Sequence, residues 1–264
     1  MADHEATSVF ERDGDLFVPT PRAISVWDPT TLHGGAPTAL LAMLIDRLPA
    51  PAEMRVARLT VELMRPVPYA PLSVTTEVVR DGKRIQLVEA VIHAARAEIV
   101  RARALRLRAA DVALPETYSQ GTPRYRWEDA SPFDFSDEPR LNVGFFTAVE
   151  LRRAHGAWLE RGPSAHWFRL RIPLVAGELN TPLIHVTAAS DFANGLSSEL
   201  SFHQYRYVNP DLTIALLRAP SAEWVLLDAV TRLAPNGSGI ARATLHDEHG
   251  ELGHVLQTLF VDTR

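Results

Sequence analysis

The stretch LTIALLRAP, residues 212–220, decides the fold, because LTVELMRPVP, residues 59–68, has nearly the same pattern. Both stretches alternate apolar and polar side chains with a period of two, which predicts a half-buried β-strand. A chain that contains the same amphipathic strand twice is expected to contain the same small domain twice.

The spacing around these two strands supports a repeat. Thr60 in the first stretch and Thr213 in the second are 153 positions apart. The middle of the last predicted strand of each half follows 44 residues later, at Ala104 and at Gln257. Equal spacing over this distance predicts a true tandem duplication.

Each half combines one buried helix with a meander of strands. In the first half, leucine and isoleucine recur at three- and four-residue steps over 40–48, after the tripeptide HGG at 33–35. This period predicts a helix that begins near Pro37. Long alternating runs follow, with Asp81-Gly82 as a hairpin turn. Residues 180–202 contain a second helical stretch, and we place Asp191 near its opening.

The remaining turns and the domain boundaries follow from composition. The dipeptides Asn236-Gly237 and His249-Gly250 predict turns between the last strands. Residues 109–140 are rich in Pro, Asp, Glu and Ser and lack either period, which is typical of a linker. We therefore expect an N-terminal domain at 1–108, a linker at 109–140 and a C-terminal domain at 141–264, in an α+β fold.

Composition restricts the class of protein. The chain has 264 residues, 46% hydrophobic and 22% charged, with a net charge of −5. This balance is that of a globular protein without a basic field, so we expect no nucleic acid or membrane as partner. With no cysteine, no signal-like N-terminus and no run of eighteen apolar residues, the expected location is cytoplasmic.

Several motifs together resemble one family. The tripeptide HGG before a buried helix, SDFANGLSSEL, NPDLTIALLRAPSAEWVLLDA and GHVLQTLF look like those of the double hotdog acyl-CoA thioesterases, the acyl-CoA thioesterase II family and its thioesterase-like relatives. The resemblance covers nearly the whole chain except the linker. It implies a tandem hotdog, each half an antiparallel sheet wrapped around a central helix, and an acyl-CoA substrate without cofactor. It is also compatible with a homo-oligomer.

The resemblance also implies a site. In that family a carboxylate, a hydroxyl or amide, and a glutamine gather around one water, and Asp191, Asn209 and Gln257 match them here. Asn209 departs from the family pattern, which usually has Thr or Ser. Asp191 would take a proton from the water. Backbone amides of Gly34 or Gly35, at a helix N-terminus, would stabilise the oxyanion.

Simpler explanations exist for each of these residues. Asp191 would also suit a helix N-cap or first turn, and Asn209-Pro210 is by itself a turn signal. Gln257 is the most informative, because an amide within VLQTLF must face solvent or a polar pocket. For His33 we expect a capping or loop role rather than that of a base.

Other polar residues have structural interpretations. Arg65 and Arg218, equivalent by the repeat, are expected to cap strands or to pair with carboxylates across the interface. Lys83 and Arg84 could meet coenzyme A phosphates, although a hairpin tip with two cations is usually just solvated. The HDEHG group at 246–250 is typical of an exposed turn, and we expect no metal.

Two other functions were compared with thioester hydrolysis. A hotdog hydratase acting on 2-enoyl-CoA is disfavoured, because DFANGL has Leu196 where the D-x-N-P-x-H pattern of such enzymes needs a His. A non-catalytic acyl-CoA- or lipid-binding double hotdog is kept as the alternative, because of the Asn209 departure.

Overall fold

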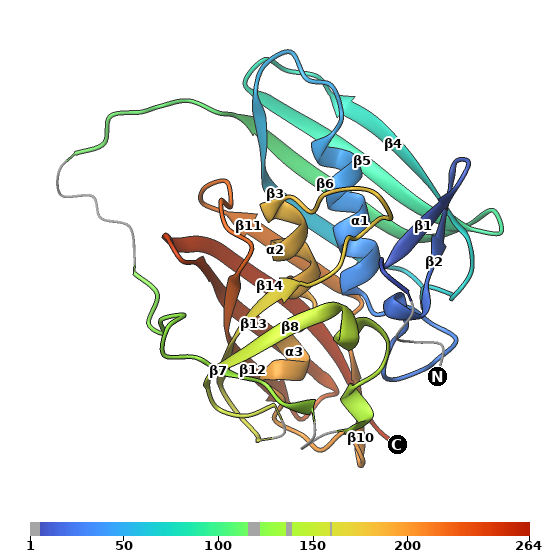
Figure 1. Ribbon diagram of the computed structural model, residues 1–264, viewed down its shortest axis with the longest axis vertical. Helices are drawn as coiled ribbons and strands as arrows, with labels where there is room; N and C mark the ends of the chain where they lie inside the picture. The colour runs from blue at the N-terminus through green and yellow to red at the C-terminus, as the bar shows by residue number, and fades with distance from the viewer. Residues whose placement is uncertain (1–5, 116–121, 136–138, 159) are drawn as a thin grey trace.

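The computed structural model describes residues 6–115, 122–135, 139–158 and 160–264, and one antiparallel sheet dominates them (Figure 1). The sheet has 14 strands in the order β1-β2-β4-β5-β6-β3-β11-β14-β13-β12-β9-β8-β7, with β10 also paired to β14. The first six strands are β1 Phe10–Asp13, β2 Leu16–Pro19, β3 Met54–Leu63, β4 Leu72–Arg80, β5 Ile85–Ala94 and β6 Ala97–Arg108. The others are β7 Ser131–Pro132, β8 Val149–His155, β9 Ser164–Leu170, β10 Tyr205–Val208, β11 Asp211–Leu216, β12 Val225–Ala234, β13 Ser238–Asp247 and β14 Gly250–Thr263.

Two main helices pack in the hollow of this sheet. The helices are α1 Gly35–Asp46, α2 Pro182–Ser190 and the single turn α3 Ala193–Leu196, with 3₁₀ turns at Pro21–Ala23, Pro139–Leu141 and Gly144–Ala148. Figure 1 shows α1 and α2 next to each other. Ten of the twelve residues of α1 are buried, because one side packs on the sheet and the other on α2. The α+β tandem architecture predicted from the sequence is confirmed.

The two halves meet at a symmetric pair of strands. Strands β3 and β11 are antiparallel, with Thr60 directly opposite Thr213 and their hydroxyl oxygens 3.3 Å apart. These are the two threonines that the repeat relates, so a local two-fold axis passes between them. Hydrogen bonds along this pair join the two sheets and leave neither with an open edge there.

The repeat spacing holds along the hairpins that follow. Strand β13 begins and ends 153 residues after β5 begins and ends. The turns predicted at Asp81-Gly82 and Asn236-Gly237 lie between paired strands, and the one predicted at His249-Gly250 lies where β13 turns into β14, so all three are confirmed.

One strand differs between the halves. Strand β3 is continuous, whereas its counterpart is divided into β10 and β11 at Asn209 and Pro210. Proline has no N–H to donate to a ladder, which favours a break at this point. The first-half residue that corresponds to Asn209 is the buried Val56, at a register shift in β3.

Part of the predicted linker packs on the second half. Residues 109–115 contain no helix or strand. The Trp127 ring lies 4.1 Å from that of Trp224, between centroids, and the Arg152 guanidinium stacks 4.0 Å from the Trp127 ring. The segment around Trp127 thereby covers an outer patch of β9 and β12. The domain boundaries at 108 and 141 stay a prediction.

A buried ion pair fixes the last turn. Arg218 donates to both carboxylate oxygens of Asp247 and to the carbonyl oxygen of Gly250. This confirms a structural role for Arg218, although its partner lies in the same half and not across the interface. Burial raises the pKa of Asp247, but hydrogen bonds from Arg218, His249 and Ser221 outweigh it, so the pKa is lowered.

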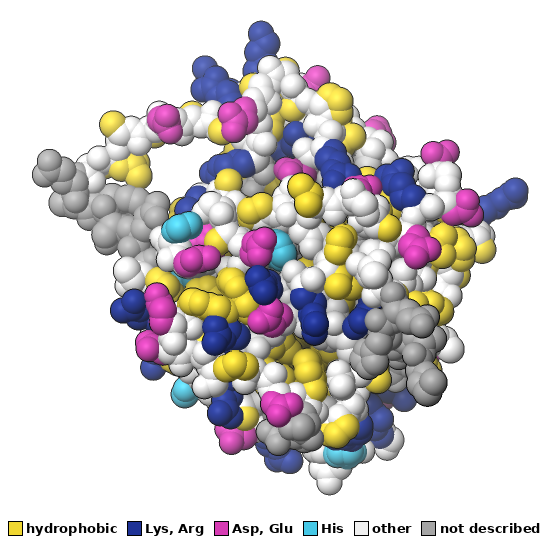
Figure 2. All heavy atoms as spheres, in the orientation of Figure 1, with side chains coloured by type: hydrophobic (Ala, Val, Ile, Leu, Met, Phe, Trp, Pro, Cys, Tyr) yellow, Lys and Arg dark blue, Asp and Glu magenta, His cyan; other side chains and the backbone are white. Residues whose placement is uncertain are grey.

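Basic and acidic side chains are scattered over the face seen in Figure 2. No helix in the described part of the chain is long and apolar enough to span a membrane.

We predict that Asp247→Ala lowers the free energy of unfolding by about 3–5 kcal/mol, because it leaves the Arg218 guanidinium without its buried partner. Chemical denaturation at neutral pH measures this. The exposed Asp15→Ala is the control, with a change within about 0.5 kcal/mol. In the wild type the contribution is lost as pH falls through the lowered pKa of Asp247. Equal changes in the two variants would contradict the assignment.

Candidate active site

Asp191 lies at the end of a helix, not at its opening. It is the C-cap of α2, and α3 begins two residues later. The prediction that it opens the helix was wrong, because α2 begins at Pro182, well before Asp191, and ends at Ser190. A carboxylate is disfavoured at a helix C-terminus, where the dipole is negative. A helix-capping role therefore does not explain why an aspartate occupies position 191.

The Asp191 carboxylate contacts both halves of the chain. From the second half, Asn209 donates its side-chain amide to Asp191 Oδ1 at 2.8 Å. From the first half, His33 Nδ1 lies 3.2 Å from Asp191 Oδ2. A Cβ on Gly34 would be 2.7 Å from Oδ2, so any side chain at position 34 would displace the carboxylate. The side chain of Asp191 is only 7% exposed.

Gln257 supports the chain on which Asp191 sits. It is fully buried, and its amide nitrogen donates to the carbonyl oxygens of Asp191 and Ser190 at 3.2 and 3.4 Å. Its amide oxygen accepts the N–H of Asn194 at 3.1 Å. Gln257 thus holds the junction of α2 and α3 through backbone groups. The repeat places the small, apolar Ala104 at the corresponding site in the first half.

Asn194 is a member of this network that the sequence analysis missed. Its side-chain amide donates to Asn209 Oδ1 at 3.0 Å, while its N–H donates to Gln257. Asn194 therefore connects the other two amide residues. Its position three residues after Asp191 in a helical segment was the only available signal.

His33 caps the first helix and also contacts the acid. Its Nδ1 accepts the N–H of Gly35 at 3.1 Å, which confirms the capping role. The sequence gave no sign that the same nitrogen would face Asp191. Burial among the rings of Phe145 and Phe192 lowers the pKa of His33, and the Asp191 carboxylate raises it in part. The imidazole is thus neutral at neutral pH.

The two glycines differ in what their amides can do. The Gly35 N–H is engaged by His33, whereas the Gly34 N–H has no acceptor among the described residues. Gly34 also lines the cavity described below. A Cβ on Gly35 would be 2.6 Å from the carbonyl oxygen of Ala188, so Gly35 permits close packing of α1 on α2. Of the two, Gly34 has the free donor.

A cavity of about 670 Å³ adjoins this network. His33, Gly34, Asp191 and Asn209 line it, together with Asn194. Gly35 and Gln257 are not among its lining residues. The buried rings of Phe146, Trp158 and Phe192 also line it, as do exposed residues of β10 and of the loop after β3. The cavity therefore extends from a polar, exposed side to an aromatic interior.

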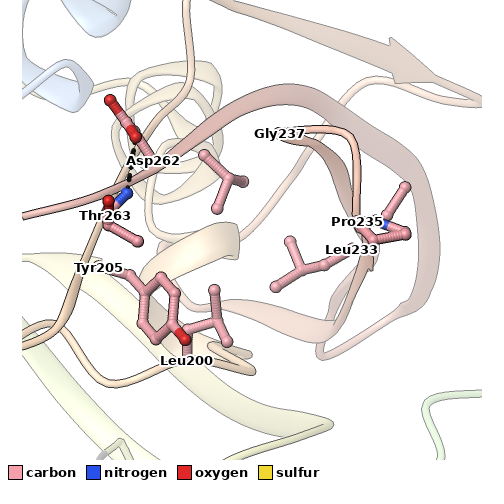
Figure 3. A pocket seen from close by; sticks show the side chains of 9 residues that line it. Leu200, Tyr205, Leu233, Pro235, Gly237, Asp262 and Thr263 are labelled. Carbon is pink, nitrogen blue, oxygen red and sulfur yellow. Dashed lines mark hydrogen bonds between the residues drawn. The ribbon is translucent and has the colours of Figure 1, made fainter.

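A second, shallower pocket of about 400 Å³ lies over β10 and the ends of β12 and β14. Figure 3 shows Tyr205, Leu200 and Leu233 around it, with Asp262 at its rim. None of the predicted site residues lines it. Among the described residues no group of three or more His, Asp or Glu side chains is arranged to hold a metal ion.

Comparisons with known proteins agree on one family. Residues 23–107 match the family model described as the acyl-CoA thioesterase N-terminal domain, and residues 125–261 match the C-terminal domain of the same enzymes. A search of curated proteins found no match.

Similar solved structures include three bacterial proteins. A putative thioesterase II from Thermobifida fusca has a TM-score of 0.73 and 17% identity, covering 98% of this chain and 97% of its own. A putative thioesterase from Novosphingobium aromaticivorans has a TM-score of 0.70 and 18% identity, with coverage of 97% and 99%. An acyl-CoA thioesterase II from Mycobacterium marinum has a TM-score of 0.66 and 16% identity, covering 100% of this chain and 98% of its own. At these identities they support the fold, and the two domain models identify the chain as a member of the acyl-CoA thioesterase family.

Proposed function

We propose that the protein hydrolyses acyl-CoA thioesters to the free acid and coenzyme A, with a water activated by Asp191. The observation that carries this proposal is the meeting of Asp191 from the second half and the Gly34 backbone from the first on one cavity wall. A base and an unpaired N–H donor are the two groups that water attack on a thioester requires.

The proposed reaction uses Asp191 twice. Asp191 takes a proton from water as the oxygen attacks the acyl carbon, and the Gly34 N–H stabilises the oxyanion that forms. The C–S bond then breaks, and the proton passes from Asp191 to the sulfur of coenzyme A.

Asn209 and Gln257 have different parts in the proposal. Asn209 donates one N–H to Asp191 and lines the cavity, so its second N–H is placed to orient the water. Gln257 contacts backbone groups on both sides of Asp191 and acts as a positioning residue. Family members usually have Thr or Ser at the Asn209 position, and an amide can replace their hydroxyl as a donor.

The alternative is a protein that binds acyl-CoA or lipid without turnover. Asn209 as a departure from the family pattern favours this second candidate. The hydratase remains disfavoured, because Leu196 is fully buried among apolar residues and provides no acid or base.

The proposal also covers the location and the assembly of the protein. We infer a reducing compartment such as the cytoplasm, since the chain has no cysteine. A homo-oligomer remains part of the proposal, and the exposed Ile240, Leu256 and Phe260 on β13 and β14 are an apolar surface for it.

We predict that Asp191→Asn lowers kcat for acyl-CoA hydrolysis by about 10²–10⁴-fold, because the amide cannot take a proton from water. Thiol release from acyl-CoAs of several chain lengths measures this. Thermal unfolding of the variant checks that the fold is retained. Undiminished thiol release would eliminate Asp191 as the base, and tight binding of acyl-CoA by the wild type without turnover would favour the binding protein.

We predict that Gln257→Ala lowers kcat by about 10²-fold, since loss of its bonds lets the α2–α3 junction and the Asp191 carboxylate move. KM should stay near the wild-type value, because Gln257 does not line the cavity. Steady-state kinetics on the folded variant measure kcat and KM separately, and its melting temperature shows whether the fold is retained. A rise in KM with unchanged kcat would refute the positioning role.

We predict that Gly34→Ala reduces kcat strongly, because the added Cβ must displace the Asp191 carboxylate. Gly195→Ala is the matched control: its Cβ would meet Trp158 at an ordinary contact distance of 3.4 Å. Kinetics of the two variants, compared at equal folded fraction, measure the difference. Similar activity in both would contradict the closeness of Gly34 and Asp191.

A further inference from the structure

Three arginines lie on the exposed side of the cavity. Arg65 follows β3, Arg206 lies on β10 and Arg264 follows β14, and all three line the cavity and are solvent-exposed. The acidic residues that line it are Asp28 and Asp191. Hydrogen bonds from Thr30 lower the pKa of Asp28, so it is ionised at neutral pH. Three guanidinium side chains and two carboxylate side chains thus line this cavity in a chain of net negative charge.

Comparison of the two halves shows that Arg65 lacks, among the described residues, the carboxylate partner that its counterpart has. Arg218, 153 positions later, is held by Asp247. The first-half position that corresponds to Asp247 is Ala94 at the end of β5. Arg65 makes no ion pair among the described residues. The prediction that it pairs with a carboxylate therefore finds no support, and Arg65 is exposed where it lines the cavity.

The other two arginines are also without a carboxylate partner in the described chain. Arg206 faces Asp262 across the β10–β14 ladder, but the Asp262 carboxylate accepts the N–H of Thr263 and forms no salt bridge with Arg206. The Arg264 Nε donates to the carbonyl oxygen of Tyr205 at 3.3 Å, which fixes its stem next to β10.

An aromatic surface lies beside these cations. Trp27 is 53% exposed, and its ring centroid is 4.6 Å from that of Phe202. Phe202 stacks in turn on Tyr207 at 4.7 Å. All three line the cavity. A large exposed indole that is held by neighbouring rings is a suitable face for a nucleobase, because bases stack on aromatic side chains.

We propose that Arg65, Arg206 and Arg264 bind the phosphates of the 3′-phosphoadenosine diphosphate part of coenzyme A, with Trp27 stacking on its adenine. Guanidinium groups bind phosphate with paired, charge-assisted hydrogen bonds, and this nucleotide carries three phosphates beside one base. This assignment rests on the proposed hydrolysis of acyl-CoA. It places the nucleotide away from Lys83 and Arg84, which do not line the cavity.

The test compares two substrates with the same acyl group, one on coenzyme A and one on N-acetylcysteamine, which lacks the nucleotide. For the double variant Arg65→Ala/Arg206→Ala we expect KM for the coenzyme A ester to rise about tenfold or more, with kcat unchanged. Kinetics with the N-acetylcysteamine ester should stay as in the wild type. Added salt should raise KM of the wild type more than that of the variant, which retains only Arg264 of the three. Lys83→Ala/Arg84→Ala removes the same charge elsewhere and should leave KM unchanged.

Several results would overturn the assignment. It fails if the arginine variant loses activity equally on both substrates, if only the Lys83 and Arg84 variant raises KM, or if the arginines matter for a carrier-protein thioester but not for coenzyme A. Calorimetry of free coenzyme A with the wild type and the arginine variant provides a readout independent of turnover. Equal affinity would refute the nucleotide site even if the protein hydrolyses acyl-CoA, and weaker binding by the variant would support it even if the protein does not.

Discussion

The antiparallel pairing of β3 with β11 is the constraint on which the rest of the structure depends. With Thr60 opposite Thr213, the two sheets continue into one another and the helices of the two halves must lie side by side. The N-terminus of α1 then meets the C-terminus of α2. This arrangement brings Gly34 within contact of Asp191, although 157 positions separate them in the chain.

Duplication of the domain allowed its two copies to diverge. The positions of Asn209 and Gln257 correspond to Val56 and Ala104, so the first copy has apolar residues where the second has amides. The pair Arg218–Asp247 shows the opposite division: the second copy keeps an ion pair for stability, and the first copy keeps only Arg65. The second copy therefore has a polar network, and the first has an arginine without an ion pair among the described residues. Both contribute to the lining of the same cavity.

The sequence predicted the features that arise from regular spacing. The alternating strands, the hairpin turns, the buried helix after HGG and the repeat of 153 positions are all local or periodic signals, and the structure confirms them. The proximity of Asp191 and Asn209 was expected only through resemblance to a family. Spacing alone does not fix how side chains of different strands and helices meet.

The contacts that the sequence missed depend on tertiary packing. His33 faces Asp191 because α1 crosses α2 at Gly35, and Asn194 joins Gln257 to Asn209 because α2 stops at Asp191. Neither helix end could be located closely enough from a period of 3.6 residues. The placement of Asp191 at a helix opening was wrong for the same reason.

The most direct test of a single site shared by both copies is a crystal structure with a non-hydrolysable acyl-CoA analogue. The account predicts that the acyl carbonyl oxygen accepts the Gly34 N–H at about 3 Å, with a water between the acyl carbon and Asp191. An analogue bound beside Val56 and Ala104, or with its carbonyl away from both Gly34 and Asp191, would contradict the account.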